Sequence, residues 1–134
     1  MAKMNIEASA GHLEEVQDFL TEEMNKAEIS EDTIFKVNLA AEEAFINIAE
    51  YAYGTENGMA EVSVEISSSK KVTVTFRDQG KAFNPLEVSE PGRERFEDEN
   101  LIGGFGIFII RKMMDSVAYQ YSEGKNILSM ECSD

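Results

Sequence analysis

The sequence is poor in several features that would assign it to other classes of protein. It has one cysteine, Cys132, which excludes an internal disulfide and a thiolate metal cluster. No stretch resembles a signal peptide or a membrane span, because the apolar run from Phe105 to Ile110 is short and ends in Arg111-Lys112. From these absences we expect a cytoplasmic protein with no part embedded in a membrane.

Basic residues are also scarce. The chain has 12 Lys and Arg against 26 Asp and Glu, a formal net charge of −14. A nucleic-acid surface needs clustered basic residues, and an anionic membrane repels acidic ones, so neither is expected as a partner. Any bound nucleotide must therefore be held by local backbone dipoles and a divalent cation. The single histidine, His12, is expected to be solvated and to have no catalytic role.

The hydrophobic pattern predicts an α+β fold in one domain, residues 1–134. A short strand at 4–8 precedes a helix that Ser9 caps, in which Leu13, Val16, Leu20 and Met24 recur at helical spacing. A second helix begins at Ser30 and continues to Ala52. Alternating apolar residues then predict two antiparallel hairpins, with a loop and a third helix between them. The expected order is β-α-α-β-β-loop-α-β-β, and the second hairpin is expected to turn at Gly124-Lys125.

Polar side chains line one side of the second helix. Glu43, Asn47 and Glu50 follow one another at i, i+4 and i+7, so they fall on one narrow strip of its surface. An amide oxygen can coordinate Mg²⁺, and a carboxylate one turn away can accept a proton. The alternative is an ordinary polar face, which an acidic chain forms readily.

Two glycine-containing segments are further candidates for a binding site. Asp78-Gln79-Gly80 ends a predicted strand, and a carboxylate there suits an adenine amino group better than a guanine carbonyl; a simple turn is the alternative. Gly103-Gly104-Phe105-Gly106 opens an apolar helix whose first N–H groups could bind phosphate, or it is merely a loop before a buried helix. Residues 81–102 between them show no period and contain both prolines. A loop of this length is usually functional or disordered, and we expect it to form a lid over a ligand.

Taken in order, these segments resemble the GHKL ATP-binding superfamily over essentially the whole chain. The finer resemblance is to the small anti-sigma-factor serine kinases. It is carried by Ala-Ala-Glu-Glu-Ala-Phe-Ile-Asn-Ile-Ala-Glu-Tyr-Ala-Tyr-Gly, Phe-Arg-Asp-Gln-Gly-Lys-Ala-Phe-Asn-Pro and Gly-Gly-Phe-Gly-Ile-Phe-Ile-Ile-Arg-Lys-Met-Met-Asp. The resemblance implies a two-layer sandwich, a mostly antiparallel sheet with three main helices on one face.

The resemblance also implies a role for each candidate residue. Asn47 would coordinate Mg²⁺ at the phosphates of ATP, and Glu43 would be the general base. Asp78 would recognise adenine, and Gly80 would let the base lie close to the strand. The ATP-binding set is completed by the third helix's opening residues Gly103, Gly104, Phe105 and Gly106.

As a function, the resemblance implies an ATP-dependent kinase that phosphorylates a serine of a STAS-type anti-anti-sigma protein and sequesters a sigma factor, as a homodimer. A nucleotide-binding module that captures partners without phosphoryl transfer is the alternative, and a detached half of a histidine kinase is disfavoured. The chain departs from the family at Glu50, often histidine, and at Ile102, where an arginine is absent. Lys125 and Asn126 stand where the family commonly has a threonine that touches phosphate. Replacement cations could come from Arg93, Arg95 or Lys125.

Overall fold

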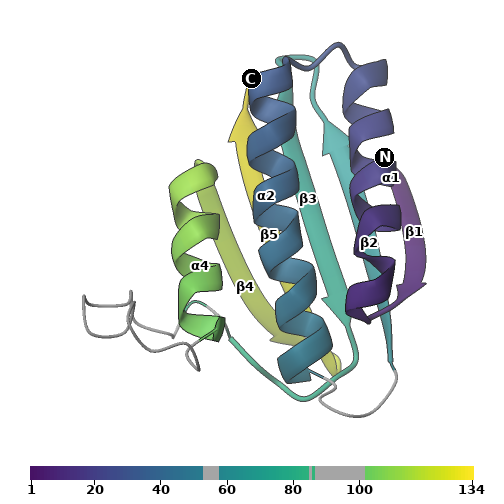
Figure 1. The fold of residues 1–134 in the computed structure, drawn as a ribbon, viewed down its shortest axis with the longest axis vertical. Helices are drawn as coiled ribbons and strands as arrows, with labels where there is room; N and C mark the ends of the chain where they lie inside the picture. The colour runs from purple at the N-terminus through teal and green to yellow at the C-terminus, as the bar shows by residue number, and fades with distance from the viewer. Residues whose placement is uncertain (53–57, 85, 87–101) are drawn as a thin grey trace.

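Three helices cover one face of a five-stranded sheet in the computed structural model of the chain, and none of the described residues forms a helix on the opposite face (Figure 1). The structure describes residues 1–52, 58–84, 86 and 102–134. The predicted α+β sandwich, with an antiparallel sheet and three helices on one side, is confirmed for this part of the chain. Among these residues no helix is both long and apolar enough to cross a membrane.

The strands lie in the spatial order β1-β2-β3-β5-β4, and every neighbouring pair is antiparallel. Both predicted hairpins are present, β2 with β3 and β4 with β5. The second hairpin turns one residue earlier than predicted, because Glu123 (φ 54°) and Gly124 (φ 77°) form the two-residue loop and Lys125 already pairs with Ser122. Positive φ at both loop positions matches the twist of the flanking strands. The bounds are β1 Ala2–Glu7, β2 Met59–Ile66, β3 Lys71–Asp78, β4 Ser116–Ser122 and β5 Lys125–Ser133.

The helices are α1 (Leu13–Lys26), α2 (Glu31–Asn47) and α4 (Ile102–Met113). The Ser30 hydroxyl caps α2 by accepting a hydrogen bond from the Thr33 amide. The prediction that Ser9 caps α1 is wrong. A 3₁₀ turn, η1 (Ala10–His12), separates Ser9 from α1, and the Ser9 side chain makes no capping hydrogen bond. His12 lies on that turn and pairs with Glu15 at 3.0 Å, at the surface.

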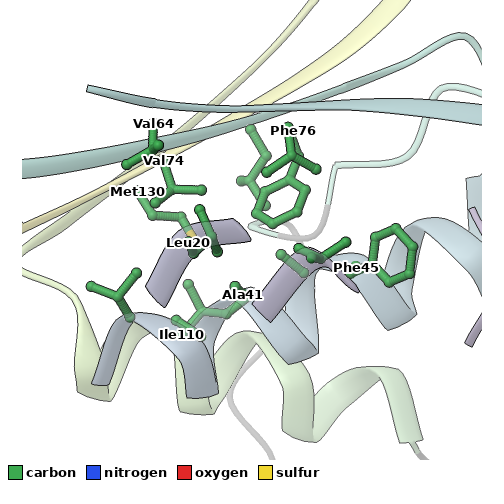
Figure 2. Packing of buried hydrophobic residues seen from close by; sticks show 14 of the residues in the cluster. Leu20, Ala41, Phe45, Val64, Val74, Phe76, Ile110 and Met130 are labelled. Carbon is green, nitrogen blue, oxygen red and sulfur yellow. The ribbon is translucent and has the colours of Figure 1, made fainter. Parts of the chain in front are cut away.

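The core fills the space between the helices and the covered face of the sheet. Leu20 of α1, Ala41 and Phe45 of α2 and Ile110 of α4 lie opposite Phe76 and other strand residues (Figure 2). Each of these side chains is almost completely buried. Burial of a large apolar side chain contributes roughly 1.5–3 kcal/mol, so this layer holds the helices in place over the sheet.

The second helix changes its winding after Asn47. The prediction continued an α-helix to Ala52, but α2 ends at Asn47 and a π-helical turn, η2 (Ile48–Ala52), follows. Five residues are too few for a hydrophobic period to distinguish the two windings. Glu50 therefore does not continue the α-helical strip of Glu43 and Asn47. Single π turns within helices are frequent at functional sites.

Two predicted segments fall mainly outside the described residues. The turn predicted at 54–58 is described only at Gly58, and the lid predicted at 81–102 only at residues 81–84, 86 and 102. Of the predicted lid, the described residue Leu86 is fixed to α4, because its carbonyl accepts a hydrogen bond of 3.0 Å from Arg111 Nη2.

Candidate functional site

A hollow lies between the end of α2 and the ends of β3 and β5. It contains about 340 Å³ of empty space, some of it open to solvent. Three buried polar residues line it, Asn47, Asp78 and Asn126, and the rest of the lining is mostly apolar. We call it the slot. Its other lining residues are Ala44, Ile48, Phe76, Phe83, Tyr119 and Leu128.

The slot exists because α2 and β3 end, and β5 begins, at the same place. Asn47 is the last residue of α2, and Asp78 is the last residue of β3. Asp78 is directly opposite Asn126 in the antiparallel pairing of β3 with β5. Both belong to the alternate positions whose other members, such as Phe76 and Leu128, are buried under the helices. The polar side chains therefore point into the helix–sheet layer where the apolar packing stops.

Asp78 is held by two hydrogen bonds that share one oxygen. Its Oδ1 accepts from the Gly80 amide at 2.9 Å and from Asn126 Nδ2 at 2.9 Å. Neither bond uses Oδ2. The carboxylate is only 4% exposed, and burial raises its pKa, although the hydrogen bonds from Asn126 and Gly80 oppose the shift. Asp78 can thus offer an acceptor atom to a ligand in the slot.

The raised pKa of Asp78 predicts how its replacement alters stability. The folded state binds this proton more tightly than the unfolded state, so stability associated with Asp78 is present at low pH and is lost as pH rises through the raised pKa. Asp78→Asn keeps an oxygen for Gly80 and Asn126 but cannot ionise. The free energy of unfolding of Asp78→Asn, measured relative to the parent, should therefore increase from pH 4 to pH 7, by about 1.4 kcal/mol for each pH unit by which burial raises the pKa of Asp78. Urea unfolding at both pH values measures this, and a constant difference would contradict it.

Asn47 has an incompletely satisfied side chain. It is 7% exposed, and its Nδ2 is buried without a hydrogen-bond partner among the described residues. A buried unpaired amide costs roughly 1–3 kcal/mol, so such atoms in proteins usually have a partner. The Nδ2 donor of Asn47 is thus available to a ligand in the slot.

Glu43 lies on α2 one turn before Asn47, as predicted, but it is not among the residues that line the slot. Its pKa is raised, first by burial and then by the negative charges of Glu42 and Glu50. Glu50 is exposed on the π turn. A half-buried carboxylate with a raised pKa has the property required of a general base that works near neutral pH.

The glycine-rich run lies in the first turns of α4, which begins at Ile102, one residue before Gly103. The prediction that this helix opens on glycines is confirmed. Helix α4 packs against α2, and its beginning lies at the same end of the helical layer as the end of α2 (Figure 1). The first N–H groups of a helix lack partners within the helix. The unpaired N–H groups of α4 therefore lie near the end of α2 that carries Asn47. Side chains at 102–106, including Phe105, lie outside the description.

Of the three proposed replacement cations, only one is described. Arg93 and Arg95 lie outside the described residues. Lys125 lines a different hollow, together with Glu61 and Arg77, whose guanidinium is 3.3 Å from the Glu61 carboxylate. Lys125 is thus not among the residues that line the slot.

Sequence reasoning missed the role of Asn126 and the contribution of Tyr119 to the slot. A signal for Asn126 was present, because it occupies the first of the alternate positions Asn126, Leu128, Met130 and Cys132. A polar residue in a buried apolar register must find hydrogen bonds inside the protein. Tyr119 had no such signal, since its strand β4 is mostly exposed.

Comparison with known proteins identifies the family of the chain. Residues 6–132 match the family described as the histidine kinase-like ATPase domain. The chain is 29% identical over 97 residues to the serine/threonine-protein kinase BtrW of Bordetella bronchiseptica, covering 72% of this chain and 68% of that protein. It is 28% identical over 132 residues to the serine-protein kinase RsbW of Staphylococcus epidermidis, covering 93% and 82%.

The fold has counterparts among solved structures. One is in the SiaB-SiaC complex from Pseudomonas aeruginosa, with a TM-score of 0.61 and 14% identity, covering 98% of this chain and 89% of that one. That likeness concerns the fold alone. The family match spans nearly all of the chain, and the resemblance seen in the sequence is confirmed. The chain therefore belongs to the histidine kinase-like ATPase domain family.

Proposed function

We propose that this protein is an ATP-dependent serine kinase that acts as an anti-sigma factor in the cytoplasm. In this proposal it phosphorylates a STAS-type anti-anti-sigma protein and sequesters a sigma factor, as a homodimer. Its relatives named serine-protein kinases support the kinase part of the proposal. The partners and the dimer are carried over from the resemblance.

The observation that carries the proposal is the meeting of Asn47 and Asp78 in one slot. They lie 31 positions apart in sequence and on different elements, yet both are buried polar residues in a mostly apolar hollow. A flat base needs apolar walls and few, well-placed polar groups. Asp78 Oδ2 supplies an acceptor for the adenine amino group, and Gly80 keeps the turn beside it free of a side chain.

The same arrangement assigns roles at the phosphates. The free N–H groups at the start of α4, those of Gly103 and Gly104 among them, would bind the phosphate chain, and Phe105 and Gly106 would complete the ATP-binding set in the same turn. Glu43 would accept the proton of the attacking serine hydroxyl. Phosphoryl transfer requires mainly positioning and charge neutralisation, so these groups need not form covalent bonds to the phosphate.

The residues present also fit a magnesium ion. Among the described residues no group of three or more His, Cys, Asp or Glu side chains could hold a metal. The ion would therefore be bound by the Asn47 amide oxygen together with phosphate oxygens and water, the usual pattern for Mg²⁺ with nucleotides. Its contribution would be to neutralise phosphate charge. The fit rests on the Asn47 amide oxygen, which is a hard oxygen ligand, while the unpaired Nδ2 of the same side chain would suit a phosphate oxygen beside the ion.

Labelled ATP tests the proposal against the non-catalytic alternative. The purified protein is incubated with Mg²⁺, ATP labelled at the γ-phosphate and a candidate STAS-type protein from the same genome. We expect label on a serine of the STAS protein. ATP-dependent complex formation without label would instead establish a regulatory module that captures partners, and the absence of nucleotide binding would refute both functions.

A further inference from the structure

Asn126 is the most completely hydrogen-bonded side chain of the slot. Its Nδ2 donates to Asp78 Oδ1 and to the Lys81 carbonyl, each at 2.9 Å. Its Oδ1 accepts from the Phe83 amide at 3.0 Å and from the Tyr119 hydroxyl. A carboxamide has two donor hydrogens and two acceptor lone pairs, so these four bonds use its whole capacity.

A residue in this state has no hydrogen bond left for a ligand. Asn126 is 5% exposed although it lines the slot, and none of its polar atoms is unsatisfied. A direct hydrogen bond between Asn126 and a base would require breaking one of the four bonds that the side chain already makes. Its effect on a bound base must therefore pass through the groups that it holds.

The group best placed for this is the Asp78 carboxylate. With Gly80, Asn126 makes the second of two hydrogen bonds to Oδ1. Two donors on one oxygen fix the plane of a carboxylate, and they leave Oδ2 as its other acceptor. Without Asn126 only the local turn bond from Gly80 would remain, and the carboxylate could rotate.

The same side chain also holds a wall of the slot. Its bonds to Lys81 and Phe83 tie the segment that follows β3 to the start of strand β5. Phe83 and Tyr119 both line the slot. Asn126 thus joins the acceptor for the base and two aromatic walls in one network.

We propose that Asn126 is a positioning residue that sets base selectivity, by holding Asp78 so that Oδ2 selects a purine with a 6-amino group. This inference rests on the proposed ATP binding. It differs from a direct nucleotide contact, because the side chain acts through Asp78.

The test compares two nucleotides that differ only at the exocyclic group. The affinities of the intact protein for Mg-ATP and for purine riboside triphosphate, which lacks the 6-amino group, are measured by calorimetry. The parent protein should prefer ATP by about tenfold or more, the range expected for loss of a buried hydrogen-bond partner. In Asn126→Leu the ratio should fall to about threefold or less, as in Asp78→Asn, through loss of ATP affinity alone.

The matched control is Ser129→Ala. It also removes a side-chain hydrogen bond between β3 and β5, the 3.2 Å contact of Ser129 with Thr75, but on the face of the sheet that carries no helix. Its selectivity should equal that of the parent. If Asn126→Leu weakens both nucleotides equally and keeps the ratio, the residue is merely structural and the inference is wrong. If the parent binds neither nucleotide, the proposed function itself fails.

A crystal structure of the parent protein with a non-hydrolysable ATP analogue keeps the inference testable should Asn126→Leu not fold. We expect Oδ2 of Asp78 to accept from the base amino group while Asn126 keeps its four internal bonds. A direct hydrogen bond between the Asn126 amide and the base would overturn the inference.

Discussion

Asn47→Ala should abolish magnesium-dependent binding of ATP, with a loss of affinity on the order of 100-fold or more, about 2.7 kcal/mol. The substitution removes the amide proposed to coordinate the ion at the end of α2. It also removes a buried Nδ2 that has no partner among the described residues, so the folded protein loses little by the change. Calorimetric titration with ATP, in the presence of Mg²⁺ and then of a chelator, measures the effect. The parent should respond to Mg²⁺, and the variant should not.

Asn38→Ala is the matched control for this experiment. Asn38 lies on the same helix and also has a buried polar atom without a partner, Oδ1, but its Nδ2 donates to Thr21 at 2.8 Å, away from the slot. This variant should lose stability and keep its affinity for Mg-ATP. If Asn47→Ala binds Mg-ATP as tightly as Asn38→Ala does, the metal role of Asn47 is wrong.

Glu43→Gln should separate binding from chemistry. The amide has the shape of the carboxylate but cannot accept the serine proton, so the rate of transfer should fall by about 10²–10⁴-fold while ATP affinity stays within about threefold. Single-turnover transfer from labelled ATP to a STAS protein measures the first quantity, and calorimetry measures the second. Transfer at the parental rate would remove Glu43 from the mechanism.

Glu42→Gln is the control, and it carries a pH dependence of its own. The charge of Glu42 helps to raise the pKa of Glu43, so removing it should lower that pKa. A general base acts in its ionised form, and the acid limb of the transfer rate should therefore move to lower pH in Glu42→Gln. At pH values well above that limb the two rates should be equal, because Glu43 is then ionised in both proteins.

Local patterns in the sequence determined most of the fold. Alternation in residues 62–66 and 72–76 predicted the β2–β3 hairpin, because a half-buried strand has a period of two. Helical spacing of Val16, Leu20 and Met24 predicted α1, whose buried residues are these three. Errors arose where a few residues decide the winding, at Ser9 and after Asn47.

The candidate residues came from the sequence one by one, and each had a plain alternative. Glu43 and Asn47 could have been an ordinary polar face, and Asp78 could have been a strand end. Spacing along a helix gives the relation of Asn47 to Glu43 but not its distance from Asp78. The prediction that these residues form one site rested on the resemblance to a family. The match over residues 6–132 confirms that the chain belongs to that family.

Only the tertiary structure decided that Asn47 and Asp78 line one slot, and that Asn126 is the residue bonded to Asp78. The contact between Asp78 and Asn126 joins positions 48 apart through the pairing of β3 with β5. The period of apolar residues in the sequence indicates which face of a helix or strand is buried, because the residues of one face recur at a fixed spacing along that element. Whether a buried polar atom is satisfied depends on elements distant in sequence, and hydrogen bonds act over about 3 Å. The sequence thus determined the elements and the kind of chemistry, and the packing of α2 on β3 and β5 determined the site.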